Sequence, residues 1–253
     1  QLITAALLVL MDDQVILFIG DIFATGTSQG LNVFAPIVTI IAVVTIINAF
    51  NMVDGHDGLA ASVALISLGS LIVLSITKGV GGEHFFLLTL LMTVIATFLL
   101  FNLPWLVGIH RQVYMGDAGS MLIGLMIAYF LIDFSQRGVP ITEHGIPTIK
   151  AAAIPWVIGL PLLDEVSVII KRILKRRRPW RADRGHFHHF LLDLGLGKTT
   201  VLLVLVVLQL VFASAGVLGT LHDWPDWMLF WGTFAVLIAY MVTTRFTPRR
   251  KLV

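Results

Sequence analysis

Three short polar clusters interrupt an otherwise apolar chain, and their residue types suit the handling of a metal ion and a phosphate. The first, NAFNMVDGHDG, occupies residues 48–58, the second, MGDAGS, residues 115–120, and the third, HFHH, residues 186–189. Carboxylate oxygens are ligands that Mg²⁺ prefers, and basic side chains bind phosphate oxygens. Together the clusters predict phosphate chemistry, if the fold brings them to one place.

The first cluster carries Asp54 and Asp57, three residues apart, before a long apolar run. At that spacing two side chains share one face of a helix, and the neighbouring glycines allow a tight turn and the approach of a bulky ligand. One aspartate could instead cap a helix N-terminus, although Asn51 could already serve there. Capping does not explain the pair together with Asn48. We therefore favour a site for a cation and a polyphosphate.

The second cluster places Asp117 between glycines at the start of another apolar run. A carboxylate with small neighbours at a membrane interface suits a divalent metal ion. An N-capping aspartate has the same appearance, and Ser120 could be either a second ligand or a first-turn hydroxyl.

The third cluster contains His186, His188 and His189, with Arg181 and Arg184 just before it. An H-x-H-H pattern is compatible with a transition-metal site. The aspartates of the other clusters indicate a hard cation instead. We therefore expect these histidines and arginines to bind phosphate oxygens and to stabilise developing charge.

The composition predicts an all-α, polytopic transmembrane helical bundle, with residues 1–253 as a single integral-membrane domain. The chain is 57% hydrophobic and 13% charged, with a mean hydropathy of +0.93, whereas soluble domains are roughly a quarter charged. It has no cysteine, which excludes disulfides and thiolate metal sites. Apolar runs of about 20 residues predict about eight spans, at 1–20, 32–50, 59–77, 85–106, 119–134, 149–170, 200–220 and 227–244.

The lysines and arginines predict which side of the membrane each cluster faces. Of the 17 basic residues, all but Lys78, Arg137 and Lys150 fall on the side that also carries the three clusters. The positive-inside rule makes that side cytoplasmic. Because three polar clusters on one face of a bundle indicate one site, we prefer this interpretation to ordinary solvated loops.

The motifs N-x-x-N-x-x-D-G-x-D-G-L, V-Y-M-G-D-A-G-S-x-x-I-G and H-x-H-H, in this order, resemble those of the polyprenyl-phosphate N-acetylhexosamine-1-phosphate transferases (glycosyltransferase family 4). The resemblance runs from about residue 30 to the end. HFHH is similar to the H-I-H-H form of enzymes that start O-antigen, enterobacterial common antigen or teichoic acid linkage synthesis. The resemblance implies transfer of a GlcNAc-1-phosphate group from a UDP-sugar to undecaprenyl phosphate, with release of UMP, at the bacterial inner membrane.

The resemblance also implies roles for individual residues. Asp117 matches the family's Mg²⁺-binding aspartate, with Mn²⁺ as an alternative ion. Asn51, Asp54 and Asp57 match the nucleotide-sugar and catalytic cluster, and the histidines of HFHH match those proposed to contact the diphosphate. Asn102 is similar to an asparagine near the nucleotide.

Asp164, in PLLDEV, resembles a recurrent intramembrane acid, for which a structural pair with Lys171 or Arg172 is the alternative. The family's earlier Asp-Asp-x-x-Asp motif has no match, because Asp12-Asp13 is followed by Ile16 in the fifth position. We expect that motif upstream, in a chain that is N-terminally truncated here and poorly active by itself.

The expected reaction is attack of the lipid phosphate on the β-phosphorus of the UDP-sugar, with Asp54 or Asp57 orienting the nucleophile or taking a residual proton. The expected partners are these two substrates and the bilayer, without nucleic acid, and a homodimer is compatible with the sequence. The sequence leaves open which N-acetylhexosamine is used and which polysaccharide pathway follows. The rival interpretations are an ion-coupled membrane carrier and an inactive membrane scaffold.

Overall fold

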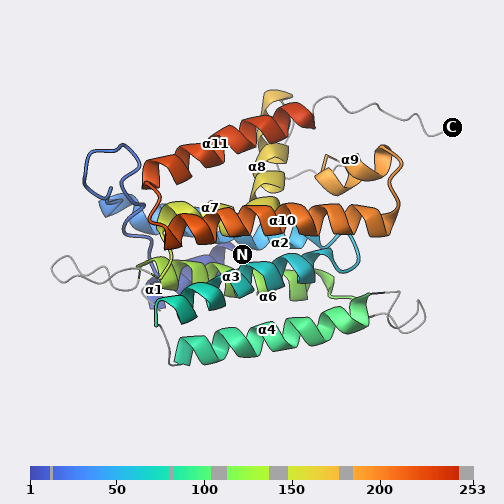
Figure 1. Ribbon diagram of the computed structural model, residues 1–253, viewed down its shortest axis with the longest axis horizontal. Coiled ribbons are helices and arrows are strands. Elements are labelled where there is room, and N and C mark those ends of the chain that lie inside the picture. Colours follow the sequence, from blue (N-terminus) through green and yellow to red (C-terminus); the bar gives the residue numbers. More distant parts are fainter. Residues whose placement is uncertain (12–13, 80–82, 104–112, 137–147, 177–184, 245–253) are drawn as a thin grey trace.

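The computed structural model describes residues 1–11, 14–79, 83–103, 113–136, 148–176 and 185–244 (Figure 1). These residues are mainly helical, and the strand-like pairing found among them is an isolated bridge between Phe18 and Gly30. The elements are α1 (Leu2–Met11), η1 (Asn32–Phe34), α2 (Ala35–Val53), α3 (Leu59–Thr77), α4 (Glu83–Asn102), α6 (Gly116–Gln136), η3 (Ala151–Ala153), α7 (Ile154–Val157), α8 (Gly159–Leu174), α9 (Phe187–Asp193), α10 (Lys198–Leu221) and α11 (Asp226–Thr243).

The described residues contain six helices long and apolar enough to cross a membrane, or seven if a bent pair counts as one span. The all-α bundle is therefore confirmed, and the described residues hold six or seven of the about eight predicted spans. The span predicted at 1–20 is wrong, because α1 ends at Met11 and the chain is not helical from residue 14 to residue 31. Two adjacent aspartates follow Met11 in the sequence, and carboxylates are costly inside a bilayer.

The long helices run roughly alongside one another, and α8 crosses their direction (Figure 1). Contact between α2 and α6 is close at Gly124, where an added Cβ would lie 2.8 Å from the Cα of Ile47. Phe50 of α2 and Phe130 of α6 are wholly buried. Because Asn51 and Asp54 follow this packed part of α2, they are held by a rigid helix.

At the end of the bundle away from the polar clusters, α11 is tied to the rest of the chain. Asp226, the first residue of α11, accepts a hydrogen bond from the backbone N–H of Asp21 (2.9 Å). Lys150 lies 3.3 Å from the other carboxylate oxygen of Asp226 and 2.8 Å from Asp223. These contacts fix one end of α11.

The predicted span at 149–170 is broken, because α7 and α8 meet at an angle of 87°. A helix break leaves backbone N–H and C=O groups without intrahelical partners, which is costly in an apolar interior. Gln209 of α10 satisfies them: it accepts from the N–H of Leu160 (2.9 Å) and donates to the carbonyl of Val157 (2.7 Å). Ser67 of α3 donates to the same carbonyl (3.0 Å). Gln209 and Ser67 are wholly buried.

Replacing Gln209 by leucine should destabilise the protein, because it leaves the N–H of Leu160 buried without an acceptor. We expect a loss of about 1–3 kcal/mol in the free energy of unfolding, since one buried unsatisfied group costs about 1–3 kcal/mol. Thermal unfolding in detergent measures this loss. The matched control is Leu210→Met, next to it on the exposed side of α10. Equal melting temperatures for Gln209→Leu and the control would contradict this account of the break.

Candidate active site

The structure brings the three polar clusters together at one end of the bundle, at the α2–α3 turn, the start of α6, and α9 (Figure 1). The Asn51 side chain accepts a hydrogen bond from the Ser120 hydroxyl (2.8 Å), which joins the first cluster to the second. The Nε2 atom of His188 lies 3.3 Å from where a Cβ on Gly55 would stand, which joins the third cluster to the first. The convergence is thus as predicted, and the binding roles remain predictions.

The α2–α3 turn is held in place by Asn102. Gly58 has the left-handed backbone conformation (φ +77°), and its N–H donates to the Asn102 side-chain oxygen (2.6 Å). The Asn102 amide in turn donates to the carbonyl of Val113 (2.7 Å), just before α6. Asn102 is therefore a buried link between the first and second clusters. A contact with the nucleotide remains a prediction for this residue.

Asp54, Asp57 and Asp117 interact electrostatically. Asp54 follows the last residue of α2 and is half-buried, whereas Asp117 is exposed in the first turn of α6. Burial, and then the negative charges of Asp117 and Asp57, raise the pKa of Asp54 from 3.8 to about 6. The three carboxylates thus form one region of negative potential at the end of the bundle.

Such a region suits a divalent cation, although it is not a complete cage. In the part of the chain that the structure describes, no group of three His, Asp or Glu side chains is arranged to hold a metal ion. Mg²⁺ usually takes only one or two protein carboxylates and completes its shell with phosphate oxygens and water. The mutual repulsion of Asp54 and Asp117 fits such a site, and Asp117 is the more exposed of the two carboxylates.

The histidine cluster is compact and partly buried. The rings of His186 and His188 are stacked 5.9 Å apart, and those of His188 and His189 are 4.1 Å apart. Burial, and then the neighbouring His189, lower the pKa of His188 from 6.5 to about 4. His188 is therefore neutral at pH 7. It can offer a hydrogen bond to a phosphate but not a positive charge.

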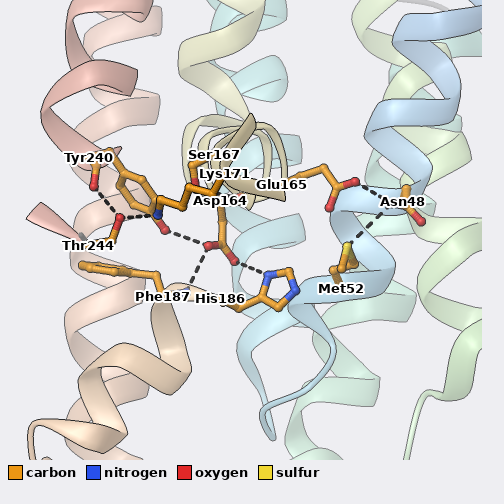
Figure 2. Close-up of polar contacts among 10 residues, drawn as sticks. All are labelled: Asn48, Met52, Asp164, Glu165, Ser167, Lys171, His186, Phe187, Tyr240 and Thr244. Atoms are coloured by element: carbon orange, nitrogen blue, oxygen red, sulfur yellow. Dashed lines mark hydrogen bonds and ion pairs between the residues drawn. The ribbon is translucent and has the colours of Figure 1, made fainter. Parts of the chain in front are cut away.

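Asp164 of α8 anchors the histidine cluster (Figure 2). One carboxylate oxygen lies 3.0 Å from the Nδ1 atom of His186. The other accepts from the backbone N–H of Phe187 (3.0 Å) and from the hydroxyl of Tyr240 (2.9 Å). Asp164 therefore pairs with His186 rather than with Lys171, whose amine instead contacts Thr244.

Glu165, the next residue of α8, reaches the first cluster on the opposite side. Its carboxylate accepts a hydrogen bond from the Asn48 amide of α2 (2.5 Å), and the side chain is buried (Figure 2). Asn48 is thus placed by Glu165, and a direct role in substrate binding stays a prediction.

The sequence analysis missed three residues of this region: Glu165, Tyr240 and His56. Glu165 could have been noticed as the second of two adjacent acids in an apolar run. His56 lies between the paired aspartates, and its Nδ1 atom is 3.2 Å from the carbonyl of Asp57. Nothing in the sequence distinguishes Tyr240 from a packing residue, because it lies in an apolar span. Asp12, Asp13, Arg181 and Arg184 lie outside the described residues.

Comparison with known proteins identifies the family. A model of glycosyl transferase family 4 matches residues 1–135, more than half of the chain, and the chain belongs to this family. It is 32% identical to an undecaprenyl-phosphate alpha-N-acetylglucosaminyl 1-phosphate transferase of Yersinia pestis over 200 residues, which are 79% of this chain and 52% of that protein. For the proteins of the same name from Haemophilus influenzae and Escherichia coli K12, the identities are 34% and 30%, covering 60% and 79% of this chain and 41% and 52% of the relative.

The chain therefore spans about half the length of the curated relatives it matches. The family resemblance predicted from the motifs is confirmed by these matches.

The raised pKa of Asp54 can be measured directly. Infrared titration of the protein with ¹³C-labelled aspartate should give a carboxylate with a midpoint near 6 that is absent in Asp54→Asn. In Asp117→Asn the midpoint should fall, because a repelling charge has been removed. Asp223→Asn, at the other end of the bundle, is the control and should leave the midpoint unchanged. An Asp54 midpoint near 4 in the wild type would contradict the described electrostatics.

The same shift has a consequence for stability. Because the pKa of Asp54 is raised in the folded state, the folded protein binds this proton more tightly than the unfolded chain does. The free energy of unfolding should therefore fall as the pH rises from about 4 to about 6. Asp54→Asn removes this contribution and should stabilise the protein at pH 7 by about 1 kcal/mol after allowance for solvent screening. The difference between the two proteins should vanish near pH 4 in denaturant titrations.

Proposed function

We propose that the protein is an enzyme that transfers a GlcNAc-1-phosphate type group from a UDP-N-acetylhexosamine to undecaprenyl phosphate and releases UMP. The observation that carries this proposal is the meeting of Asp54, Asp57 and Asp117 with the HFHH histidines at one end of a membrane-spanning bundle. Family membership and the names of the relatives support it.

The reaction is a displacement at phosphorus. An oxygen of the lipid phosphate forms a bond to the β-phosphorus of the UDP-sugar, the bond from that phosphorus to the bridging oxygen breaks, and UMP leaves with the electron pair. Such a reaction needs mainly positioning and neutralisation of charge. A Mg²⁺ ion held by Asp117 would supply neutralisation at the diphosphate, with Mn²⁺ as a substitute.

The electrostatics of the turn suggest how Asp54 contributes. A phosphate monoester has a second pKa of about 6, which is close to the raised pKa of Asp54. Asp54 can therefore accept the last proton of the lipid phosphate with little free-energy cost and leave a doubly charged nucleophile. Asp57 is three residues further on and can orient that phosphate.

The HFHH histidines are the proposed hydrogen-bonding partners of the diphosphate. His188 is neutral, because burial lowers its pKa to about 4, and it can donate one hydrogen bond without attracting a second anion. His186 and His189 are within reach of the same ligand, because their rings lie next to that of His188.

The active site is proposed to face the cytoplasm from the bacterial inner membrane. Among the described basic residues, Lys198 is exposed at the start of α10, close to α9, whereas Lys78 and Lys150 lie near Asp223 at the far end. This distribution agrees with the positive-inside rule. A lipid phosphate at the membrane surface would then meet a soluble nucleotide-sugar directly. O-antigen and other lipopolysaccharide synthesis are the pathway candidates.

The decisive test is UMP release by the full-length gene product in detergent, with undecaprenyl phosphate, UDP-GlcNAc and Mg²⁺. We expect release that requires the lipid and stops with EDTA. Activity only with another UDP-sugar would keep the reaction and change the donor. No release with any UDP-sugar would favour the carrier or the inactive scaffold, neither of which produces UMP.

Asp117→Asn should lower kcat about 100-fold or more, because it removes the ligand of the ion that neutralises the diphosphate. The measurement is the UMP assay across a range of Mg²⁺ concentrations, where the variant should also need more metal. Asp223→Asn, an exposed aspartate at the far end of the bundle, is the matched control and should keep wild-type turnover. Near-normal turnover in Asp117→Asn would exclude Asp117 as the metal ligand.

A further inference from the structure

We propose that Asp164 and Tyr240 are positioning residues that fix the orientation and the tautomer of His186, so that its Nε2 atom is presented to the phosphates. The proposal rests on the function proposed above for the HFHH histidines. It goes beyond that function because it connects the last described helix, α11, to the reacting groups.

The contacts of Asp164 define a chain through three helices. Tyr240 of α11 donates its hydroxyl to one carboxylate oxygen of Asp164 in α8, and the other oxygen faces the Nδ1 atom of His186 at the start of α9 (Figure 2). The side chain of Asp164 is 6% exposed. A buried carboxylate is costly unless its oxygens are hydrogen-bonded, and both oxygens of Asp164 have partners.

The same carboxylate also holds the backbone of α9. The N–H of Phe187 is one of the first amides of that helix, which have no partner within the helix. It donates to the oxygen of Asp164 that also accepts from Tyr240. Asp164 thus acts as a helix cap supplied by another helix, and it fixes the backbone and the ring of the histidine cluster together.

The geometry determines which nitrogen of His186 carries a proton. A carboxylate accepts hydrogen bonds at both oxygens, so the proposal puts the shared proton on the Nδ1 atom that faces it. The Nε2 atom is then free to accept a hydrogen bond or proton in the neutral ring, or to donate to a phosphate oxygen in the protonated ring. In Figure 2 the ring lies on the side of Asp164 that faces α2, where the first cluster begins.

Glu165 provides the internal comparison. It is the neighbouring acid of the same helix and is equally buried, at 3% exposed, but its hydrogen-bond partner is Asn48 of α2. A general effect of removing a buried acid from α8 would therefore appear in variants at both positions. A specific effect on the His186 tautomer would appear only in a variant at Asp164.

Asp164→Asn makes a sharp test possible. The hydroxyl of Tyr240 and the N–H of Phe187 both need an acceptor, so the amide oxygen should take the position between them. The amide NH₂ group then faces His186, whose Nδ1 atom must become an acceptor, and the proton moves to Nε2. An aspartate-to-asparagine change beside a catalytic histidine is known to produce this wrong tautomer.

The first measurement is ¹⁵N NMR of the full-length gene product with ¹⁵N-labelled histidine, at a pH where the rings are neutral. The signals of His186 are identified by their loss in His186→Gln. We expect an Nδ1–H ring in the wild type and in Glu165→Gln, and an Nε2–H ring in Asp164→Asn. Tyr240→Phe, which removes one oxygen atom, should keep the Nδ1–H form with broader signals.

The second measurement is UMP release by the same variants. We expect kcat to fall about 100-fold in Asp164→Asn and about 3- to 10-fold in Tyr240→Phe, with KM for the UDP-sugar changed less than about 3-fold. Unchanged His186 signals in Asp164→Asn would overturn the proposal, as would inverted signals with unchanged kcat. If the wild type released no UMP, the proposed function would fail, and the NMR result would still decide whether Asp164 fixes His186.

Discussion

The architecture depends on the hydrogen bonds that Gln209 makes at the break between α7 and α8. A backbone cannot turn through 87° inside an apolar bundle unless the groups it frees find other partners. Gln209 accepts from Leu160 and donates to Val157, and so it makes the turn possible. Because of the turn, α8 lies across the bundle instead of along it, and its side chains reach helices on two sides.

This crosswise position explains how distant motifs become one site. Asp164 and Glu165 are adjacent in the sequence, yet one bonds to His186 and the other to Asn48. A helix running parallel to α2 would present only one face to it. In the described structure, α8 therefore connects the aspartate motif to the histidine motif through side-chain hydrogen bonds. Asn102 has a similar function between the α2–α3 turn and the residues before α6.

The sequence predicted which residues gather at the candidate site better than it predicted the residues that support them. The polar clusters stood out because carboxylates and histidines are rare in apolar surroundings, and their separation by spans predicted their convergence. Tyr240 did not stand out, because a tyrosine in an apolar span is usually part of the packing. The helix break after Val157 could not be predicted either, because a hydropathy profile gives the length of an apolar segment but not the direction in which it runs. Residues 1–20 were wrongly predicted to form one span because their average hydropathy is apolar, although the helix ends at Met11.

The connection from Tyr240 to His186 couples the candidate active site to the thickness of the membrane. Most of the large apolar side chains of α11 are on the surface of the bundle, where lipid would surround them, and Asp226 fixes the far end of that helix. The tilt of such a helix responds to the thickness of the hydrocarbon layer. A thinner or thicker bilayer would therefore move Tyr240 relative to Asp164. The carboxylate of Asp164 would transmit this movement to the imidazole of His186. The proposed transfer would then run at different rates in detergent and in lipid, even with the same substrates and the same residues.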